Sequence, residues 1–358
     1  MDSRSQPLVS IVTPVYNNAE HIGFCIESVL GQTYGNWEYT IVNNCSTDGS
    51  GDIAHAYAAR DPRIRVVDNQ QFLRAIPNHN HALRQIAPES KYTKVVFADD
   101  WIFPRCLEEM VAIAEENPSV GIVGAYGLWE VIDREPHQHV VMWGGLLHPA
   151  RRVDGREICR RVFLDGLDVF GTATSLLYRS DLVRSRRDFF NQDNIHADKE
   201  ICVALLRDCD FGFAHQVLTF TRGRPRSLNK ISTEMYWDIG CALQTLVTHG
   251  PAVLTAEEFI ACRENHLAKY YNFLAVSAIR GRRDDAFWGF HKSKLQQTVG
   301  FDRGRLARAV IARVGRAALD PAQTIRKVSH AISSRSKSRS SRAVAGAELA
   351  KHATEASR

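Results

Sequence analysis

Residues 7–50 read PLVSIVTPVYNNAEHIGFCIESVLGQTYGNWEYTIVNNCSTDGS and contain two apolar runs separated by a helical pattern. The first run, LVSIVTPVY, and the last, WEYTIVNN, are rich in β-branched residues, which is typical of buried strands. Between them, residues 19–32 place Ile22, Ile26 and Val29 on one face at helical spacing. The order strand, helix, strand predicts parallel strands flanked by helices.

The same alternation continues to about residue 131. The runs RIRVVDN, YTKVVFA and VGIVGAYGLWEV are strand-like, and helical patterns stand between them. Farther on the alternation weakens, and the segments REICRRVFLDG, TATSLLYRSDLV and ADKEICVALLRDCD have a helical appearance. The sequence predicts one large α/β domain over residues 1–228 and a mainly helical region over residues 229–320.

Composition and charge narrow the class of protein. The 358 residues are 44% hydrophobic and 24% charged, as in soluble globular proteins, and no apolar run approaches the ~18 residues of a membrane span. The N-terminus lacks the order of segments that marks an export signal, so we expect a cytoplasmic protein. The eight cysteines form no CxxC pair, which argues against a zinc site and a disulfide framework and favours buried thiols.

The positive charge lies near the C-terminus. Residues 321–358 contain eight basic and two acidic residues, more than the whole net charge of +5, and their low complexity predicts a disordered tail. So short a tail predicts non-specific attraction to phosphates and no specific nucleic-acid partner. The helical pattern at 303–319 carries five arginines, which suit either contact with an anionic membrane or a solvated face.

Polar residues follow four of the predicted strands, at the point where each strand ends. They lie in segments 13–17, 43–48, 68–69 and 99–100. Ligands of open α/β sheets bind beyond the carboxyl ends of the strands, where such loops converge. We call these four segments the polar rim and expect them to form one ligand site.

Asp99 and Asp100 directly follow the apolar strand YTKVVFA. Two adjacent carboxylates repel one another, and their place at the end of a hydrophobic strand costs free energy unless a positive charge lies nearby. A divalent metal ion would supply that charge. Alternatively, the pair caps the helix that begins near Pro104, because acidic residues favour helix N-termini.

Three motifs together resemble the opening of the family 2 glycosyltransferases. They are P-V-Y-N at 14–17, S-x-x-x-Q-T-Y at 28–34 and S-T-D-G-S at 46–50. The likeness extends through ADDWIFP and more faintly to about Arg226. It implies the GT-A fold, a Rossmann-like mixed sheet flanked by helices, with a nucleotide-sugar half at 1–125 and an acceptor half at 126–228.

The resemblance also implies which residues bind the nucleotide-sugar. Tyr16 would stack on the base, and Asn44, which stands where the family usually has an aspartate, would accept a hydrogen bond from uracil. Arg222 and Arg224 would hold the diphosphate. The complete predicted set is Thr13, Pro14, Tyr16, Asn17, Asn44, Ser46, Asp48, Asn69, Asp99, Arg222 and Arg224.

Two carboxylates carry the chemistry that the resemblance implies. Asp100 would bind Mn²⁺ or Mg²⁺, which neutralises the departing nucleoside diphosphate. Asp198 matches the general base of inverting members, which must lie within hydrogen-bond reach of the acceptor hydroxyl. The alternative for Asp198 is an N-cap of its own helix.

The predicted function is therefore inverting, metal-assisted transfer of a sugar from a nucleotide-diphosphate donor, a UDP-sugar, to a hydroxyl of a polysaccharide or lipid-linked acceptor. The predicted location is the cytoplasm or the inner face of the membrane. Departures from the family pattern support a second hypothesis, a non-catalytic GT-A module that binds nucleotide-sugars or glycans; they are Asn43, Asn44, Phe97, Ala197 and Arg224. A sugar-1-phosphate nucleotidyltransferase ranks third, because TPVYNNAEH is not the basic, glycine-rich loop that it needs.

Overall fold

The computed structural model describes residues 6–131, 138–142, 146, 150–223 and 235–319. Basic-tail residues 321–358 lie outside this set. The chain divides into two compact units, Met1–His266 and Leu267–Arg358, which we describe separately.

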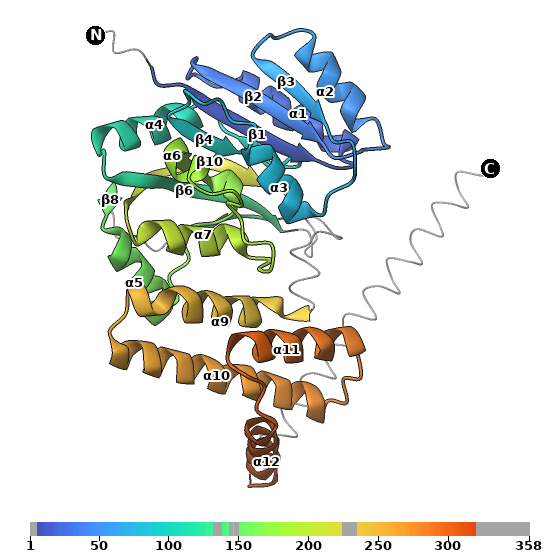
Figure 1. The fold of residues 1–358 in the computed structure, drawn as a ribbon, viewed down its shortest axis with the longest axis vertical. Coiled ribbons are helices and arrows are strands. Elements are labelled where there is room, and N and C mark those ends of the chain that lie inside the picture. Colours follow the sequence, from blue (N-terminus) through green and yellow to red (C-terminus); the bar gives the residue numbers. More distant parts are fainter. Residues whose placement is uncertain (1–5, 132–137, 143–145, 147–149, 224–234, 320–358) are drawn as a thin grey trace, which may run out of the picture. The chain divides into compact units, whose positions relative to one another are not determined.

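A mixed sheet of ten described strands forms the centre of the first unit (Figure 1). Strands β3, β2, β1 and β4 are parallel, β9 runs antiparallel to both β4 and β6, and β10 is parallel to β6. In spatial order the strands are β3 (Ile64–Asp68), β2 (Trp37–Asn43), β1 (Val9–Val15), β4 (Tyr92–Val95), β9 (Leu176–Arg179), β6 (Val120–Val131), β10 (Asp210–Thr221) and β5 (Trp101–Ile102), with β7 (Gln138–Met142) on β6 and β8 (Arg152–Val153) on β10.

Helices cover both faces of this sheet (Figure 1). Side chains alternate along β1, so that Ile11 belongs to one core and Val12 to the other. Full burial of such a side chain contributes about 1.5–3 kcal/mol. The first core contains α1 (Ala19–Leu30), α2 (Ser50–Ala58) and α4 (Cys106–Glu116), and the second contains α3 (Ala75–Leu83), α5 (Gly155–Asp165), α6 (Ser180–Arg184), α7 (Ala197–Leu206) and α9 (Trp237–His249).

Strand β9 corrects the prediction of a helical segment at TATSLLYRSDLV. Only a 3₁₀ turn (Ala173–Ser175) precedes the strand, and α6 begins after it. Leu177 packs into the first core while Leu176 and Tyr178 pack into the second. A short run that is apolar on both faces has no strand-like alternation, so its periodicity alone does not separate a strand from a helix.

The mainly helical region predicted at 229–320 is confirmed for its described residues. α10 (Ala256–Ile279) passes from the first unit into the second, which also contains α11 (Asp285–Thr298) and α12 (Arg303–Leu319). The first compact unit extends to His266 and includes α9, which packs against α7. Among the described helices, none has the length and apolarity required to cross a membrane.

Candidate functional site

Hydrogen bonds join two loops of the polar rim into one structure. Asn17 has a positive φ of 46°, which turns its side-chain oxygen to accept a bond from the Thr47 amide at 2.8 Å. The Asn17 amide donates to the Ser46 hydroxyl at 3.1 Å. Asn17 and Ser46, two predicted ligand residues, therefore lie together, and each fixes the other's loop.

Asp48 fixes the same junction. Its carboxylate accepts from the Ala19 amide at 2.8 Å and from the Ser50 amide at 3.0 Å, so it ties the start of α1 to the start of α2. Partial burial alone would raise the pKa of Asp48, but hydrogen bonds from Ser50 and Ala19 outweigh it and lower that pKa. The contacts of Asp48 are those of a loop support.

Thr13 and Pro14 lie beneath the rim and are buried. The Thr13 hydroxyl contacts the Val96 carbonyl and the Tyr39 hydroxyl, each at 2.7 Å. Its side chain is therefore occupied inside the core and is not exposed to a ligand. In contrast, the Tyr16 ring is 49% exposed, with its partner Phe72 at a centroid distance of 4.8 Å.

The Asn44 side chain is bonded through both its oxygen and its nitrogen. Its oxygen accepts from the Leu73 amide at 2.9 Å and from the Asn69 side chain at 2.8 Å, while its nitrogen donates to the Leu73 carbonyl at 2.7 Å. A carbonyl oxygen has two lone pairs, and both are used here. In this structure Asn44 and Asn69 thus hold the loop after β3, and the predicted contact of Asn44 with uracil remains a prediction.

Asp100 is almost completely buried, at 2% exposure, yet both of its oxygens have donors. The Thr174 hydroxyl donates to one oxygen at 2.7 Å, and the Arg222 amide donates to the other at 3.1 Å. Neither of these contacts is with α4, which begins at Cys106 without a side-chain cap. Helix capping therefore does not explain Asp100.

A buried lysine lies under this carboxylate. Lys94, on β4, is 0% exposed and donates from Nζ to the carbonyls of Thr174 at 2.6 Å and Leu176 at 3.1 Å. Burial lowers the pKa of Lys94, whereas the charges near it, including that of Asp100, raise it. Sequence reasoning missed both Lys94 and Thr174; the one available signal was a lysine inside the apolar strand YTKVVFA.

The described residues contain no group of three or more His, Cys, Asp and Glu that could hold a metal ion. The groups that could bind a cation here are the carboxylates of Asp99, which is half-buried, and of Asp100. This donor set fits Mg²⁺ or Mn²⁺, which commonly take one or two carboxylates and complete their shell with substrate phosphates and water.

Arg222 lies beside an aromatic pair. The rings of Trp101 and Phe220 stack at 3.6 Å with an interplanar angle of 4°, and the Arg222 guanidinium lies 5.4 Å from the Trp101 centroid. Glu130 contacts it at 3.7 Å, but Arg222 Nε is buried without a hydrogen-bond partner in the described part of the chain. Arg224 lies outside the described residues.

Asp198 lies in the first turn of α7, where His196 rather than Asp198 is the N-cap residue. The loop before it is fixed by Glu200, a residue that sequence reasoning missed, whose carboxylate accepts bonds from Asn191 and Asn194. Burial raises the pKa of Asp198, and His196 and Lys199 oppose that shift. Within the described residues, Asp198 shares no hydrogen bond with the other predicted site residues.

A family model described as "Glycosyl transferase family 2" matches residues 10–184. This stretch, just under half of the chain, is similar to that family. The match covers the polar rim, Asp99, Asp100 and Thr174, and it ends before Asp198 and Arg222. The family 2 resemblance predicted from the rim motifs is thereby confirmed.

Individual relatives agree with this family. The "Putative teichuronic acid biosynthesis glycosyltransferase TuaG" of Bacillus subtilis (strain 168) is 39% identical over 120 residues, which are 33% of this chain and 47% of that protein. The chain spans less than half the length of the curated relatives it matches first.

Solved structures share the fold. S. aureus TarS 1–349 in complex with UDP-GlcNAc matches with a TM-score of 0.58 and 14% identity, over 81% of this chain and 80% of that one. The mannosyltransferase PcManGT from Pyrobaculum calidifontis, in complex with GDP-Man and Mn²⁺, matches with a TM-score of 0.50 and 14% identity, over 90% of this chain and 84% of that one. The predicted GT-A fold with a helical C-terminal region is confirmed.

Proposed function

We propose that this chain is an inverting glycosyltransferase that moves a sugar from a UDP-sugar to an acceptor hydroxyl with the help of a divalent metal ion. One observation carries the proposal. Asp100 lies in the turn between β4 and β5, within the stretch that the family 2 model matches, and both oxygens of its carboxylate are held by neutral donors, Thr174 and the Arg222 amide. A buried carboxylate held in this way is oriented for a ligand before the ligand arrives.

The nucleotide-sugar would bind through Tyr16, on the polar rim, and through Arg222. Tyr16 offers ring surface to a base, because the ring is 49% exposed and its contact with Phe72 is T-shaped rather than stacked. Arg222 Nε, buried and without a partner in the described residues, is suited to a diphosphate oxygen. Uracil is the proposed base. A hydrogen bond from uracil to the Asn44 oxygen would replace one of the two loop hydrogen bonds that this oxygen accepts.

Asp100 would hold the metal ion and Asp99 would support it or bind the ribose. When bound, Mn²⁺ or Mg²⁺ supplies positive charge to the diphosphate oxygens as the glycosidic bond breaks. Arg222 adds a second positive charge on the same leaving group.

Asp198 would act as the general base. Its carboxylate takes the proton of the acceptor hydroxyl while the oxygen forms a bond to the anomeric carbon and the nucleoside diphosphate leaves with the electron pair of the broken bond. Attack opposite the leaving group inverts the anomeric centre, and no covalent enzyme intermediate is needed. The raised pKa of Asp198 suits this role, because a stronger base removes the proton more readily.

A polysaccharide or lipid-linked glycan is the proposed acceptor, at the cytoplasmic face of a membrane. The name of the TuaG relative, which refers to teichuronic acid biosynthesis, supports this class. α12 supports the membrane location, because its arginines accompany the exposed apolar residues Ile311 and Val314, at 70% and 52% exposure.

Calorimetric titration with UDP, GDP and dTDP, each with and without Mn²⁺, is the first test. The proposal expects metal-dependent binding of UDP that is lost in Asp100→Asn. Donor hydrolysis or transfer that depends on Asp198 would then separate an enzyme from a binding module. Failure of all three nucleotides to bind to the folded protein would overturn the proposed function.

A further inference from the structure

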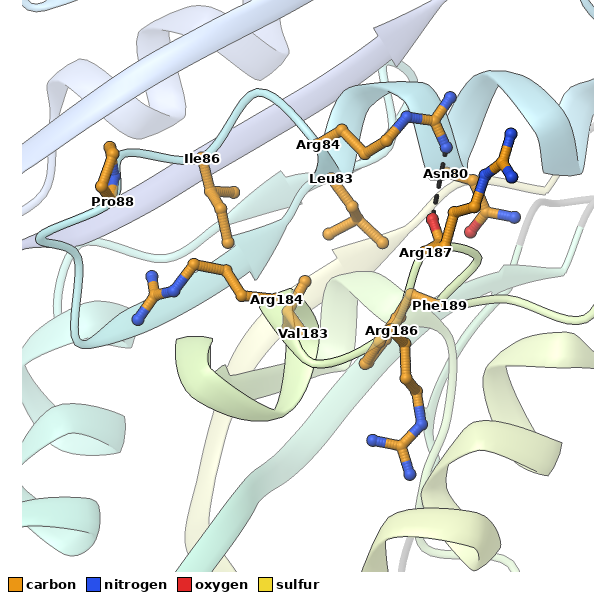
Figure 2. Close-up of a pocket in the computed structure, with 10 residues that line it drawn as sticks. All are labelled: Asn80, Leu83, Arg84, Ile86, Pro88, Val183, Arg184, Arg186, Arg187 and Phe189. Atoms are coloured by element: carbon orange, nitrogen blue, oxygen red, sulfur yellow. Dashed lines mark hydrogen bonds between the residues drawn. The ribbon is translucent and has the colours of Figure 1, made fainter.

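A hollow lies away from the polar rim, between the end of α3, the loop that follows it and the segment after α6 (Figure 2). Its volume is 350 Å³. Four of its ten lining residues are arginines: Arg84, Arg184, Arg186 and Arg187. Arg184 lies on one side, and Arg84 and Arg187 lie together on the other (Figure 2).

Most of these arginines donate to neutral groups. Arg184 donates to the carbonyls of Ala87 at 3.3 Å and Ser90 at 3.0 Å. Arg186 donates to the Leu182 carbonyl at 3.3 Å. Carbonyl oxygens satisfy the donors of a guanidinium but do not cancel its charge, so the charge of Arg184 is not neutralised by these bonds. The charge of Arg186 interacts with the Asp208 carboxylate, whose pKa is lowered mainly by Arg207 and to a lesser extent by Arg186.

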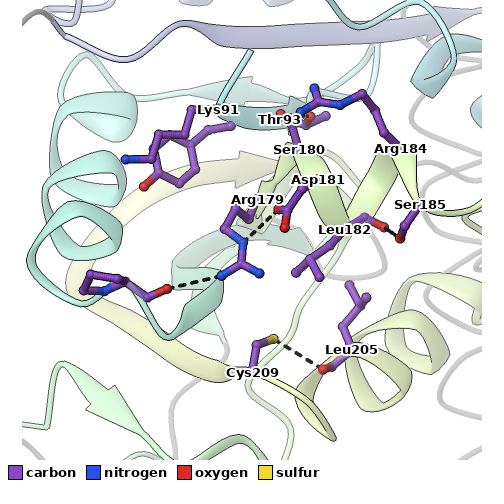
Figure 3. Close-up of polar contacts among 12 residues, drawn as sticks. Lys91, Thr93, Arg179, Ser180, Asp181, Leu182, Arg184, Ser185, Leu205 and Cys209 are labelled. Carbon is purple, nitrogen blue, oxygen red and sulfur yellow. Dashed lines mark hydrogen bonds and ion pairs between the residues drawn. The ribbon is translucent and has the colours of Figure 1, made fainter. Parts of the chain in front are cut away.

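A neighbouring arginine shows the contrast. Arg179, at the end of β9, donates to the Asp181 carboxylate at 2.8 Å, so its charge is compensated (Figure 3). Arg184 lies close by on α6 without such a partner (Figure 3). The two neighbouring arginines therefore differ: the charge of Arg179 is paired with a carboxylate, whereas Arg184 donates to backbone carbonyls.

Acidic residues near the hollow compensate it only weakly. Asp188 contacts Arg84 at 3.5 Å, and both side chains are nearly half exposed, so solvent weakens the pair. Glu89 is exposed and forms no ion pair with a described residue. Arg187 is exposed and its guanidinium has no bonding partner among the described residues. The hollow therefore keeps a net positive charge.

The remaining lining is mostly apolar. Leu83, Ile86, Pro88, Val183 and Phe189 line the space between the arginines, and Asn80 is the other polar member. Arginine forks bind phosphate oxygens in pairs of parallel hydrogen bonds, and an apolar wall favours a hydrocarbon chain attached to that phosphate. A free inorganic anion would gain only from the first of these two features.

We propose that this hollow binds the phosphate group of an anionic lipid, with the lipid chain against the apolar wall. The site would hold the first unit at a phosphate-rich surface. The proposal rests on the contacts of the hollow alone and stands whether or not the chain transfers sugars.

The test uses the full chain and two probes, a short-chain phosphatidic acid below its micelle-forming concentration and inorganic pyrophosphate. The variant is Arg84→Glu with Arg187→Glu, two exposed side chains whose loss leaves the core intact. The control is Arg60→Glu, an exposed arginine outside the hollow. Binding is measured by calorimetry, and folding by thermal unfolding.

We expect the wild-type chain to bind the lipid phosphate more tightly than pyrophosphate. The double variant should bind it at least ~30-fold more weakly, the loss expected for one charged hydrogen-bonded contact of about 2 kcal/mol, while Arg60→Glu binds as wild type does. Pyrophosphate that binds equally or more tightly, and whose binding is weakened in the double variant, would overturn the lipid assignment. An unchanged affinity in the double variant, or an equal loss in the control, would overturn the site itself.

Discussion

Asp100 and Asp198 are two carboxylates in one compact unit, and the structure treats them differently. Asp100 is buried with donors on both oxygens, whereas Asp198 is half-buried and, among the described residues, its carboxylate accepts a bond from the adjacent Lys199 amide at 2.9 Å. The first arrangement fixes a direction, which a metal ligand needs. The second leaves a charge poorly solvated, which raises the pKa and suits proton transfer.

Removal of the Asp100 charge is the strongest test of this contrast. Asp100→Asn keeps the side-chain volume but loses the charge that a divalent ion requires, so activity should fall by about 10³- to 10⁴-fold, equivalent to several kcal/mol. Metal-dependent UDP binding should disappear in calorimetry. Wild-type activity in this variant, with its thermal unfolding unchanged, would show that Asp100 has no part in the reaction.

Asp198→Asn should leave donor binding intact and remove the base. We expect kcat to fall by about 10²- to 10³-fold, within the usual contribution of a general base, with the KM for the donor nearly unchanged. Steady-state kinetics at fixed metal concentration measures both quantities. An equal loss of donor affinity would instead place Asp198 at the nucleotide.

Asp198 also predicts a pH-dependent effect on stability. Its pKa is raised in the folded protein, so its contribution to stability is greatest below the unfolded value of about 3.9 and is lost as pH rises through the folded pKa. Asn has no ionisable group, so Asp198→Asn removes the destabilisation caused by ionisation of Asp198. The variant should therefore have a higher melting temperature than wild type at pH 7, and this difference should vanish towards pH 3. A lower melting temperature at pH 7 would contradict the desolvation of Asp198.

The support beneath Asp100 can be tested without a change of charge. Thr174→Val keeps the shape of Thr174 but removes the hydroxyl that donates to the carboxylate, so metal affinity should fall by about 10- to 100-fold, as for other residues that orient a metal ligand. Ser175→Ala is the matched control, since Ser175 is buried next to Thr174 but bonds weakly to Thr219 at 3.4 Å. Similar losses in the two variants would indicate general damage to the 3₁₀ turn.

The smallest expected effect concerns the rim loops. Asp48→Ala removes the acceptor for the Ala19 and Ser50 amides, and the free energy of unfolding should fall by about 1 kcal/mol, a typical capping contribution. Asp52 lies on the exposed side of the first turn of α2, and Asp52→Ala should change the free energy of unfolding by only a few tenths of the effect of Asp48→Ala. Urea titration compares the two variants. A larger loss in Asp52→Ala would contradict the role of Asp48 as a loop support.

The first half of the fold was predictable from the sequence because its signals are local. Each strand from β1 to β4 is an apolar run next to a helical pattern, and the carboxyl ends of parallel strands meet, so the positions of the rim loops followed. β9 was not predictable in the same way. It is apolar on both faces, and only its partners β4 and β6 distinguish it from a helix.

The contacts of the candidate site residues could not be predicted from the sequence. Asp100 stood out because a charged pair follows a strand, but its donors Thr174 and Arg222 come from segments distant in the sequence. The engagement of Asn44 by Leu73 and Asn69 was invisible for the same reason, since a side chain's free lone pairs depend on neighbours that spacing does not reveal. The roles predicted for the site residues, including Asp100 and Asp198, remain predictions.

The position of β9 has a consequence for how the chain is made. β4 is complete at Val95 and β6 at Val131, but the strand that joins them ends only at Arg179. At about 5–20 residues per second, a ribosome needs several seconds to supply it, and until then β4 and β6 both present unpaired edges. A chain that stops before Leu176 therefore keeps these edges open and is exposed to aggregation, so any shortened version of this protein should extend beyond β9.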